Sequence, residues 1–315
     1  MALELDKLIN KKSKKNNDNL SDEINTVAII GQGNVGRSLT WAVAGNGIGV
    51  TCIEKDKESA IKAEKILEHE LDLAINHWRL TAGEKRSILS RAYFTSDLTK
   101  SVDADLIIET VTENFELKKN IFKKLDDIVL DDVIYATNSS ALSITELAAE
   151  LKRPENFIGI HLLSPVLKVP IFEVIRGMKT SDQTFNKIKS FAKSLNKKII
   201  EIKESPGFVT TRVIMPMLNE AMYVLMEGVT NGINIDKTVK FGYDMNEGPL
   251  TIADRIGLDK VLRILEILFK ESGEQKYRPC PILKRLVRAG YLGKKTNKGF
   301  FIYDKKGNII GENDV

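Results

Sequence analysis

The stretch from Val27 to Gly36 constrains the fold of this chain more than any other part of its sequence. It reads VAIIGQGNVG, an apolar run that ends in three glycines spaced G-x-G-x-x-G and then continues into RSLTWAVA. A continuous apolar run is typical of a strand buried on both faces of a parallel sheet. The glycines predict a tight turn at Gly31, a backbone open to a pyrophosphate at Gly33, and close packing of helix against strand at Gly36.

A second strand and an acidic residue follow at the spacing that a dinucleotide-binding unit requires. Residues 50–53 form the apolar run VTCI, and Glu54 comes directly after it. A carboxylate about 20 residues beyond the glycines can bind the ribose 2′-hydroxyl of NAD. The order of strand, glycine loop, helix, strand and acid favours this interpretation over an ordinary turn followed by a solvated glutamate. The cofactor residues predicted in this unit are Gly31, Gln32, Gly33, Asn34, Val35, Gly36 and Glu54.

Strand and helix patterns alternate over the first two-thirds of the chain. A long apolar stripe from Ala60 to Trp78, followed by a capping box at Thr81 and Glu84, predicts a helical hairpin inserted after the second strand. Further helices are expected over residues 117–130, from a capping box at 143–146, and from a cap at Thr180 to residue 195. The alternation predicts an α/β fold with a Rossmann-type, doubly wound sheet. Its further strands are expected at residues 93–95, 104–111, 133–138, 157–160, 171–175 and 198–202.

The pattern changes near residue 204. Beyond Arg212 only helical periodicity is found, over residues 213–225, 235–241, 251–269 and 281–289, before a short GFFIY segment at 299–303. The chain has 315 residues, enough for two cores. We therefore expect an NAD-binding domain over residues 25–203 and an all-α substrate and dimerisation domain over 204–315. Residues 1–24 have mixed charge and no apolar segment of a targeting signal, so we expect a mobile tail.

Composition excludes several classes of protein. The formal net charge of +4 is too small and too diffuse to indicate nucleic-acid binding. No run of about 18 apolar residues occurs, so no membrane span is expected. Cys52 and Cys280 form no disulfide framework and no metal motif, so we expect no metal and a reducing, cytoplasmic location.

His161 and Glu173 could form a catalytic pair. His161 follows a predicted strand at the sheet edge where doubly wound folds bind ligands, and Glu173 lies on the next strand. Adjacent strands would bring the carboxylate to one imidazole nitrogen, which suits the pair to taking a proton from an alcohol. A lone histidine in such a place is more often structural, so the pattern leaves both interpretations open. The segment 138–140 offers hydroxyl donors at the same edge, or else caps the helix that begins near Ser143.

These motifs together resemble the L-3-hydroxyacyl-CoA dehydrogenases of fatty acid metabolism. The resemblance covers nearly the whole chain, in order, from about residue 25 to 303. It is carried by GQGNVG at 31–36, ETVTEN at 109–114, TNSS at 137–140, HLLSP at 161–165, Glu173, SPGF at 205–208 and GPL at 248–250.

The resemblance implies a reaction and a set of roles. A hydride would pass from C3 of a 3-hydroxyacyl thioester to NAD, with His161 as the base, Glu173 as its partner and Ser140 bonded to the substrate oxygen. It also implies that the helical domain forms a homodimer interface. The further cofactor-site residues implied are Glu113, Lys118 and Lys295.

Four departures from the family pattern are found. Ser164 and Thr211 stand where the family usually has asparagines that position cofactor and substrate, and a hydroxyl is shorter and offers fewer groups. We expect Ser164 at the cofactor and Thr211 at the substrate. Glu70 and His77, on the predicted hairpin, replace a serine and a lysine that contact CoA in relatives, and residues 246–247 replace a Pro-Met pair.

The departures leave the acyl carrier open. CoA is the family default, but a carboxylate at Glu70 would repel CoA phosphates. An acyl-carrier-protein thioester, as used in polyketide-type biosynthesis, is therefore an alternative. A non-catalytic NAD-binding dimer, similar to some lens crystallins of this fold, is another, and the retained His161 and Glu173 argue against it.

Overall fold

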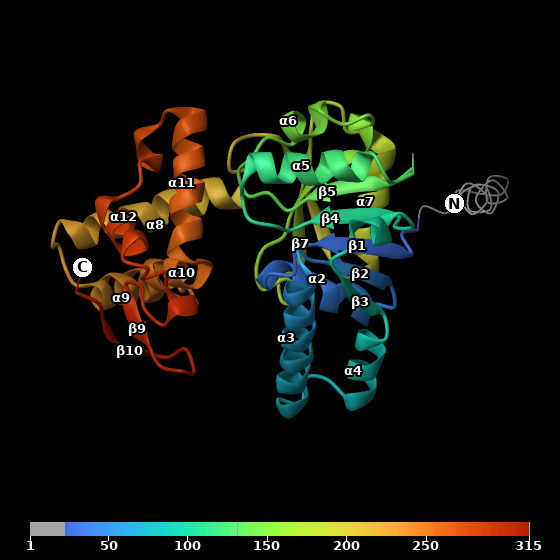
Figure 1. Ribbon diagram of the computed structural model, residues 1–315. Helices are drawn as coiled ribbons and strands as arrows, with labels where there is room; N and C mark the ends of the chain where they lie inside the picture. The colour runs from blue at the N-terminus through green and yellow to red at the C-terminus, as the bar shows by residue number, and fades with distance from the viewer. Residues whose placement is uncertain (1–22, 131, 315) are drawn as a thin grey trace, which may run out of the picture.

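The computed structural model describes residues 23–130 and 132–314 and shows an α/β body beside a helical body (Figure 1). The expected tail over residues 1–24 therefore lies, apart from its last two residues, outside the described chain. Between the two bodies the chain leaves the last strand of the large sheet at Lys203 and enters the first helix of the helical part at Thr210.

The α/β body is built on one eight-stranded sheet in the order β3-β2-β1-β4-β5-β6-β7-β8. Every neighbouring pair is parallel except β6 and β7, which are antiparallel. The predicted doubly wound α/β class is confirmed. The strands are β1 (Thr26–Ile30), β2 (Gly49–Ile53), β3 (Ala92–Thr95), β4 (Leu106–Glu109), β5 (Ile134–Thr137), β6 (Phe157–His161), β7 (Ile171–Arg176) and β8 (Lys198–Lys203).

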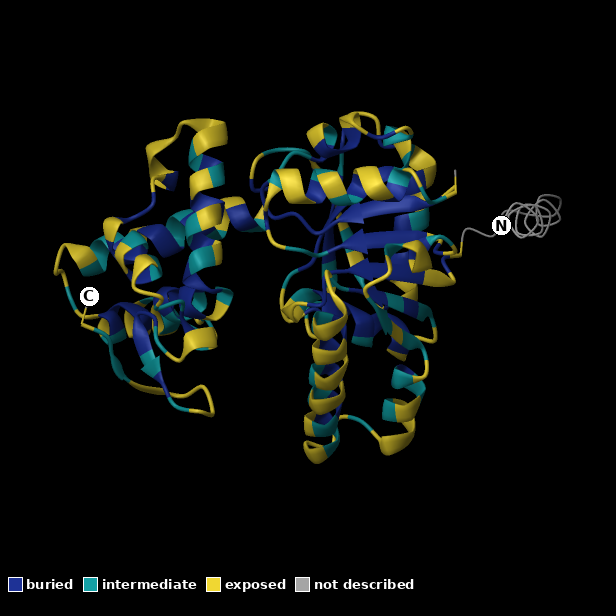
Figure 2. Ribbon diagram, in the orientation of Figure 1, coloured by how far each residue is buried: buried dark blue, intermediate teal, exposed yellow. Residues whose placement is uncertain are grey.

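Helices cover both faces of this sheet and leave its central strands buried (Figure 2). One core is formed with α2, α3 and α7, whose apolar residues pack on alternate side chains of β1 such as Val27 and Ile29. The other is formed with α5 and α6 against Ala28 and Ile30. The helices are α2 (Asn34–Gly45), α3 (Lys57–Asn76), α4 (Ala82–Leu89), α5 (Phe115–Asp126), α6 (Ile144–Ala149) and α7 (Asp182–Ser194).

The inserted hairpin is present as α3 and α4, and the capping box of Thr81 and Glu84 is complete. The prediction that Trp78 belongs to the apolar stripe is wrong. Helix α3 ends at Asn76, Trp78 takes a positive φ of 55°, and its side chain is 97% exposed. The helical spacing of side chains holds only for residues with helical φ and ψ. Periodicity therefore could not predict the position of a side chain beyond the end of the helix.

Two of the predicted helix caps differ in the structure. Ser181 rather than Thr180 caps α7, because the Thr180 hydroxyl donates to the Phe157 carbonyl instead. Ser143 does cap α6 by accepting from the Glu146 backbone N–H, but its own hydroxyl donates to Glu204, 61 residues away, and no reciprocal bond from the Glu146 side chain is formed.

The helical body has a break that periodicity missed. Residues 251–269, expected as one helix, form two helices because Gly257 takes a φ of +100°, outside the helical region. The GFFIY segment also gains a partner, since β9 (Phe301–Tyr303) pairs antiparallel with β10 (Ile309–Glu312). No helix in the described chain is long and apolar enough to cross a membrane. The helices are α8 (Thr210–Met226), α9 (Gly232–Gly242), α10 (Pro249–Ile256), α11 (Leu258–Ser272) and α12 (Pro281–Arg288).

Candidate active site

The glycine loop between β1 and α2 has the geometry that a pyrophosphate requires. Gly31 takes a φ of +89°, and a Cβ on Gly36 would lie 2.0 Å from the Gly31 carbonyl oxygen. These two glycines therefore allow the turn and the close approach of α2. A Cβ on Gly33, in contrast, would meet nothing within 4 Å, so the backbone is open to a ligand at this point.

The start of α2 and the end of β2 complete a nucleotide cradle. Gly33 is the N-cap of α2 and provides no side-chain cap, which leaves the first N–H groups and the positive helix end to an anion. Glu54 follows β2, and its Oε1 accepts the Gln32 backbone N–H at 2.6 Å. The Gln32 side chain bonds Ile29 and Thr40 inside the fold and is not free for a ligand. An open glycine, an uncapped helix and a carboxylate at the ribose position together fit NAD.

His161 and Glu173 meet at the carboxyl end of β6. They are directly opposite in the antiparallel register of β6 and β7, and His161 Nδ1 lies 2.6 Å from Glu173 Oε2. Both are buried, with 6% and 2% of their surfaces exposed. The carboxylate thereby holds the orientation of the ring through Nδ1. On the other side, the ring of Phe208 lies 5.9 Å from the imidazole, centroid to centroid.

Hydrogen bonds keep Glu173 ionised although it is buried. Burial raises the pKa of this carboxyl, but bonds from His161 and Thr210 outweigh it and hold the pKa below its usual value. An ionised partner stabilises the imidazolium that forms when the base accepts a proton.

Ser140 lies on a loop after β5 that a neighbouring carboxylate holds in place. Oε1 of Glu113 accepts the Ser139 hydroxyl at 2.6 Å and the backbone N–H groups of Ser140 and Ala141 at 2.7 and 2.9 Å. Within the described chain no bond ties up the Ser140 hydroxyl, which remains available to a substrate oxygen. The alternative that residues 138–140 cap α6 does not hold, because Ser143 is the cap.

Lys118 has a completely buried side chain. Its ammonium lies 2.7 and 2.8 Å from the two Glu109 oxygens and 3.7 Å from Glu113 Oε2. Burial raises the pKa of Glu113, but Lys118 and the three loop hydrogen bonds outweigh it and leave this pKa below normal. Lys118 thus has no surface of its own for a ligand and acts on the site through Glu113.

The remaining predicted residues are spread over both bodies. Ser164 is exposed on the loop between β6 and β7. Thr211 is buried in the first turn of α8. Lys295 belongs to the helical body, where its ammonium bonds both oxygens of Asp259 at 2.6 Å.

Several supporting contacts had no signal in the sequence. Asn138 accepts the Leu162 backbone N–H at 2.8 Å, and the Lys197 ammonium bonds the carbonyls of Val166 and Val169 at 2.7 Å, so both hold the loop that carries Ser164. Arg263 of α11 donates to the Thr112 hydroxyl at 2.8 Å and so joins the two bodies beside Glu113. Its partner is 151 residues away, and no local pattern reports such a pairing.

The acidic hairpin is less repulsive than the sequence suggested. Glu70 pairs with Arg37 at 3.0 Å, and Arg37 also bonds the Gln32 carbonyl at 2.8 Å. Lys85 pairs with Asp72 at 2.6 Å and with Glu68 at 3.5 Å. These ion pairs weaken the repulsion of CoA phosphates that was expected at Glu70, and with it the argument for a carrier-protein substrate.

Known proteins match the chain over nearly its whole described length. The sequence profile of the 3-hydroxyacyl-CoA dehydrogenase NAD binding domain matches residues 26–205, and that of the C-terminal domain matches residues 207–303. The 3-hydroxybutyryl-CoA dehydrogenase of Clostridioides difficile is 40% identical over 89% of this chain and 99% of its own length.

Solved structures agree with these matches. The (S)-3-hydroxybutyryl-CoA dehydrogenase PaaH1 of Ralstonia eutropha is 40% identical, covers 90% of this chain and 100% of its own, and superposes with a TM-score of 0.81. FadB2 of M. tuberculosis is 32% identical with the same coverage and a TM-score of 0.87. Matched profiles, aligned relatives and the cradle for NAD all agree, so the chain belongs to the 3-hydroxyacyl-CoA dehydrogenase family and is an NAD-dependent oxidoreductase acting on a CH–OH group.

Proposed function

We propose that the protein oxidises the 3-hydroxyl of a short-chain 3-hydroxyacyl-CoA, such as 3-hydroxybutyryl-CoA, to the 3-oxo form. The observation that carries the proposal is the His161–Glu173 pair, 2.6 Å apart and buried at the carboxyl end of β6, where α/β sheets bind their ligands. The names of the aligned relatives support the acyl length and the CoA carrier. Neither the carrier-protein reaction nor a non-catalytic dimer is favoured.

The geometry supports a role for each residue of the site. Ser140 donates a hydrogen bond to the substrate oxygen, and His161 Nε2 takes the hydroxyl proton while Nδ1–H remains bonded to Glu173. NAD, which the glycine loop and Glu54 would hold, would supply the acceptor for the hydride of C3. Glu173 stabilises the resulting imidazolium, and Glu113 with Lys118 behind it keeps the Ser140 loop in position. We assign Ser164 and Lys295 to the cofactor and Thr211 to the substrate, with residues 25–203 binding NAD and 204–315 completing the substrate site.

The test is NADH formation by the purified protein with L-3-hydroxybutyryl-CoA. The D-enantiomer and free 3-hydroxybutyrate are the controls. The D-enantiomer has the opposite configuration at C3, and the free acid lacks the thioester. Turnover of the carrier-bound thioester with none of the CoA ester would instead support the carrier-protein alternative. Tight NAD binding without turnover of either would support the non-catalytic dimer.

NAD should be preferred to NADP. The Glu54 carboxylate at the end of β2 would face a 2′-phosphate, and its repulsion should lower kcat/KM with NADP by at least about tenfold. The adjacent Lys55 does not offset this, because it is exposed and lies 3.7 Å from Asp56. Glu54→Gln should lower the ratio of kcat/KM with NAD to kcat/KM with NADP. Glu58→Gln, on the exposed first turn of α3, should leave this ratio unchanged. Equal kcat/KM with both cofactors in the wild type would contradict this prediction.

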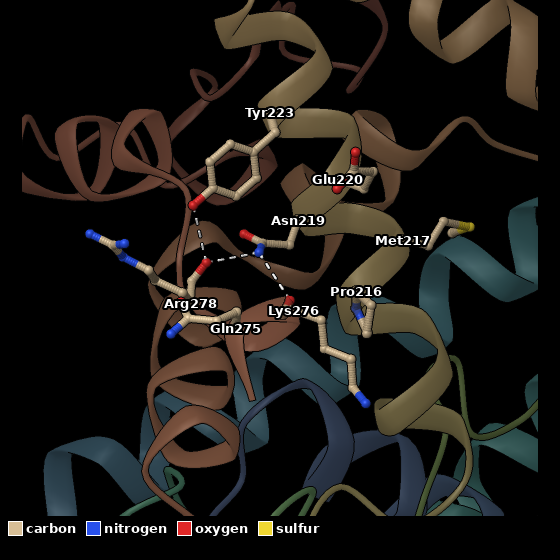
Figure 3. A pocket seen from close by; sticks show the side chains of 8 residues that line it. All are labelled: Pro216, Met217, Asn219, Glu220, Tyr223, Gln275, Lys276 and Arg278. Carbon is tan, nitrogen blue, oxygen red and sulfur yellow. Dashed lines mark hydrogen bonds between the residues drawn. The ribbon is translucent and has the colours of Figure 1, made fainter. Parts of the chain in front are cut away.

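We also propose that the protein is a cytoplasmic homodimer joined through the helical domain. Two hollows of about 550 and 510 Å³ lie on this domain and share Met217 and Glu220 of α8. Figure 3 shows the first, where the Asn219 amide bonds the backbone of Arg278 at 2.9 Å and so fastens α8 to the segment after α11. The apolar side chains left exposed around α8 and α9 are Val213, Met226, Val229, Phe241 and Tyr243.

Mass measurement in solution checks the dimer. Light scattering should give twice the 35.3 kDa mass of the chain. Val229 is 68% exposed and lines the second hollow, so Val229→Glu would bury a charge in the interface and should yield monomer. Met178→Glu is the matched control, because Met178 is 89% exposed on the α/β body. A monomeric wild type would remove the proposal.

A further inference from the structure

Both carboxylate oxygens of Glu173 accept hydrogen bonds. Oε2 bonds His161, while Oε1 accepts the Thr210 backbone N–H at 2.9 Å and the Thr210 hydroxyl at 2.7 Å. Thr210 lies 37 residues farther along the chain, and it is the first residue of α8.

This contact supplies the cap that α8 otherwise lacks. Val209, the N-cap residue, has no side chain that can accept a hydrogen bond. The first N–H groups of a helix need acceptors, and a negative charge there is stabilised by the helix dipole. The catalytic carboxylate from β7 therefore also serves as the N-terminal acceptor of the helix that opens the helical body.

Two consequences follow for the orientation of the pair. The carboxylate cannot rotate about its last bond without losing a contact to His161 or to Thr210. Within the described chain, His161 is the only charged or titratable group that contacts Glu173. On the opposite carboxylate oxygen, the Thr210 hydroxyl is the only side-chain donor in that part of the chain. The position of α8 on the α/β body therefore determines the orientation of the Glu173 carboxylate, and through it the orientation of the His161 ring.

We propose that Thr210 is a positioning residue of the catalytic pair, whose hydroxyl fixes the Glu173 carboxylate against His161 and couples the seating of the helical body to proton transfer. The inference rests on the proposed role of His161 as the base. Thr210 itself does not contact the reacting atoms. Its effect should therefore fall on kcat rather than on binding.

The decisive comparison is Thr210→Val with Thr210→Ser. Valine keeps the shape and the backbone N–H but removes the hydroxyl, and losing one hydrogen bond to a charged group should lower kcat about tenfold. KM for the acyl-CoA and Kd for NAD should stay within about twofold, because the Thr210 hydroxyl is bonded to Glu173 and not assigned to either ligand. Serine keeps the hydroxyl and should restore kcat to within about twofold of the wild type.

Thr184→Val is the matched control for a purely structural loss. Thr184 is likewise a threonine in the first turn of a helix, though more deeply buried than Thr210, and its hydroxyl donates to the Glu155 carbonyl at 2.9 Å, with no bond to the catalytic pair. Its removal should lower the melting temperature without changing kcat. A wild-type kcat in Thr210→Val, or an equal loss in Thr210→Ser, would overturn the proposal.

A measurement that needs no turnover separates this inference from the proposed function. The Nδ1 proton between His161 and Glu173, whose heavy atoms lie 2.6 Å apart, should give a downfield proton NMR resonance that is absent in His161→Ala. The resonance should move in Thr210→Val and stay in place in Thr210→Ser and Thr184→Val. If it is unmoved in Thr210→Val the inference fails, whichever substrate the enzyme uses.

Discussion

Replacing His161 with alanine should lower kcat for hydroxyacyl-CoA oxidation by about 10²-fold to 10⁴-fold, the range expected when a general base is removed. The imidazole is the group whose Nε2 remains free once Nδ1 is bonded to Glu173, and alanine leaves nothing to take the hydroxyl proton. NAD binding should be retained, because the glycine loop and Glu54 follow β1 and β2, which β4 and β5 separate from the strands β6 and β7 that carry His161 and Glu173.

Steady-state kinetics and calorimetric titration with NAD check the His161 prediction. His69→Ala is the matched control, since His69 is exposed on α3 and has no role in the proposed site. It should behave as the wild type. A wild-type rate in His161→Ala would remove the proposed mechanism, whereas a parallel loss of NAD binding would show a general folding defect instead.

Replacing Glu173 with glutamine should lower kcat by about 10³-fold or more, as when the carboxylate that orients a catalytic histidine is replaced by its amide. Both carboxylate oxygens accept hydrogen bonds, one from His161 and the other from Thr210. An amide must turn its NH₂ group toward one of these two residues, where a donor would then face a donor. The negative charge that stabilises the imidazolium is lost as well. Single-turnover kinetics would place this loss on the chemical step.

Glu201→Gln is the matched control for Glu173→Gln. Glu201 lies on the adjacent strand β8 but is exposed, and its contact is a 3.7 Å pair with Arg176. It should keep the wild-type rate. Activity of Glu173→Gln within a few fold of the wild type would show that the carboxylate is not needed.

The same substitution should change the acid stability. Because the folded pKa of Glu173 lies below its ordinary 4.5, its stabilising contribution is present above that pH and is lost as the pH falls through the folded value. Glu173→Gln, which does not titrate, should lack this part of the acid-induced loss. Urea unfolding at pH 7 and at acid pH would measure the difference between the two proteins.

Local signals in the sequence determined the parts of the protein whose geometry is set within a few residues. The glycines at 31, 33 and 36 specify the loop because only glycine fits a φ of +89° at Gly31 and a Cβ position 2.0 Å from a carbonyl at Gly36. Hydrophobic period and cap chemistry likewise predicted the alternation of strands and helices and the hairpin turn at Thr81. Each of these is a property of adjacent residues, which a sequence displays directly.

The geometry of contacts between distant residues was decided only by the tertiary structure. The sequence predicted that adjacent strands bring Glu173 to His161, but the fold sets the antiparallel register that places them directly opposite, and the packing of α8 brings Thr210 to the other carboxylate oxygen. The ion pair of Arg37 with Glu70 weakens a repulsion that was expected from charge alone. Hydrogen bonds and ion pairs depend on distances of about 3 Å, and sequence separation carries no such information until the chain has folded.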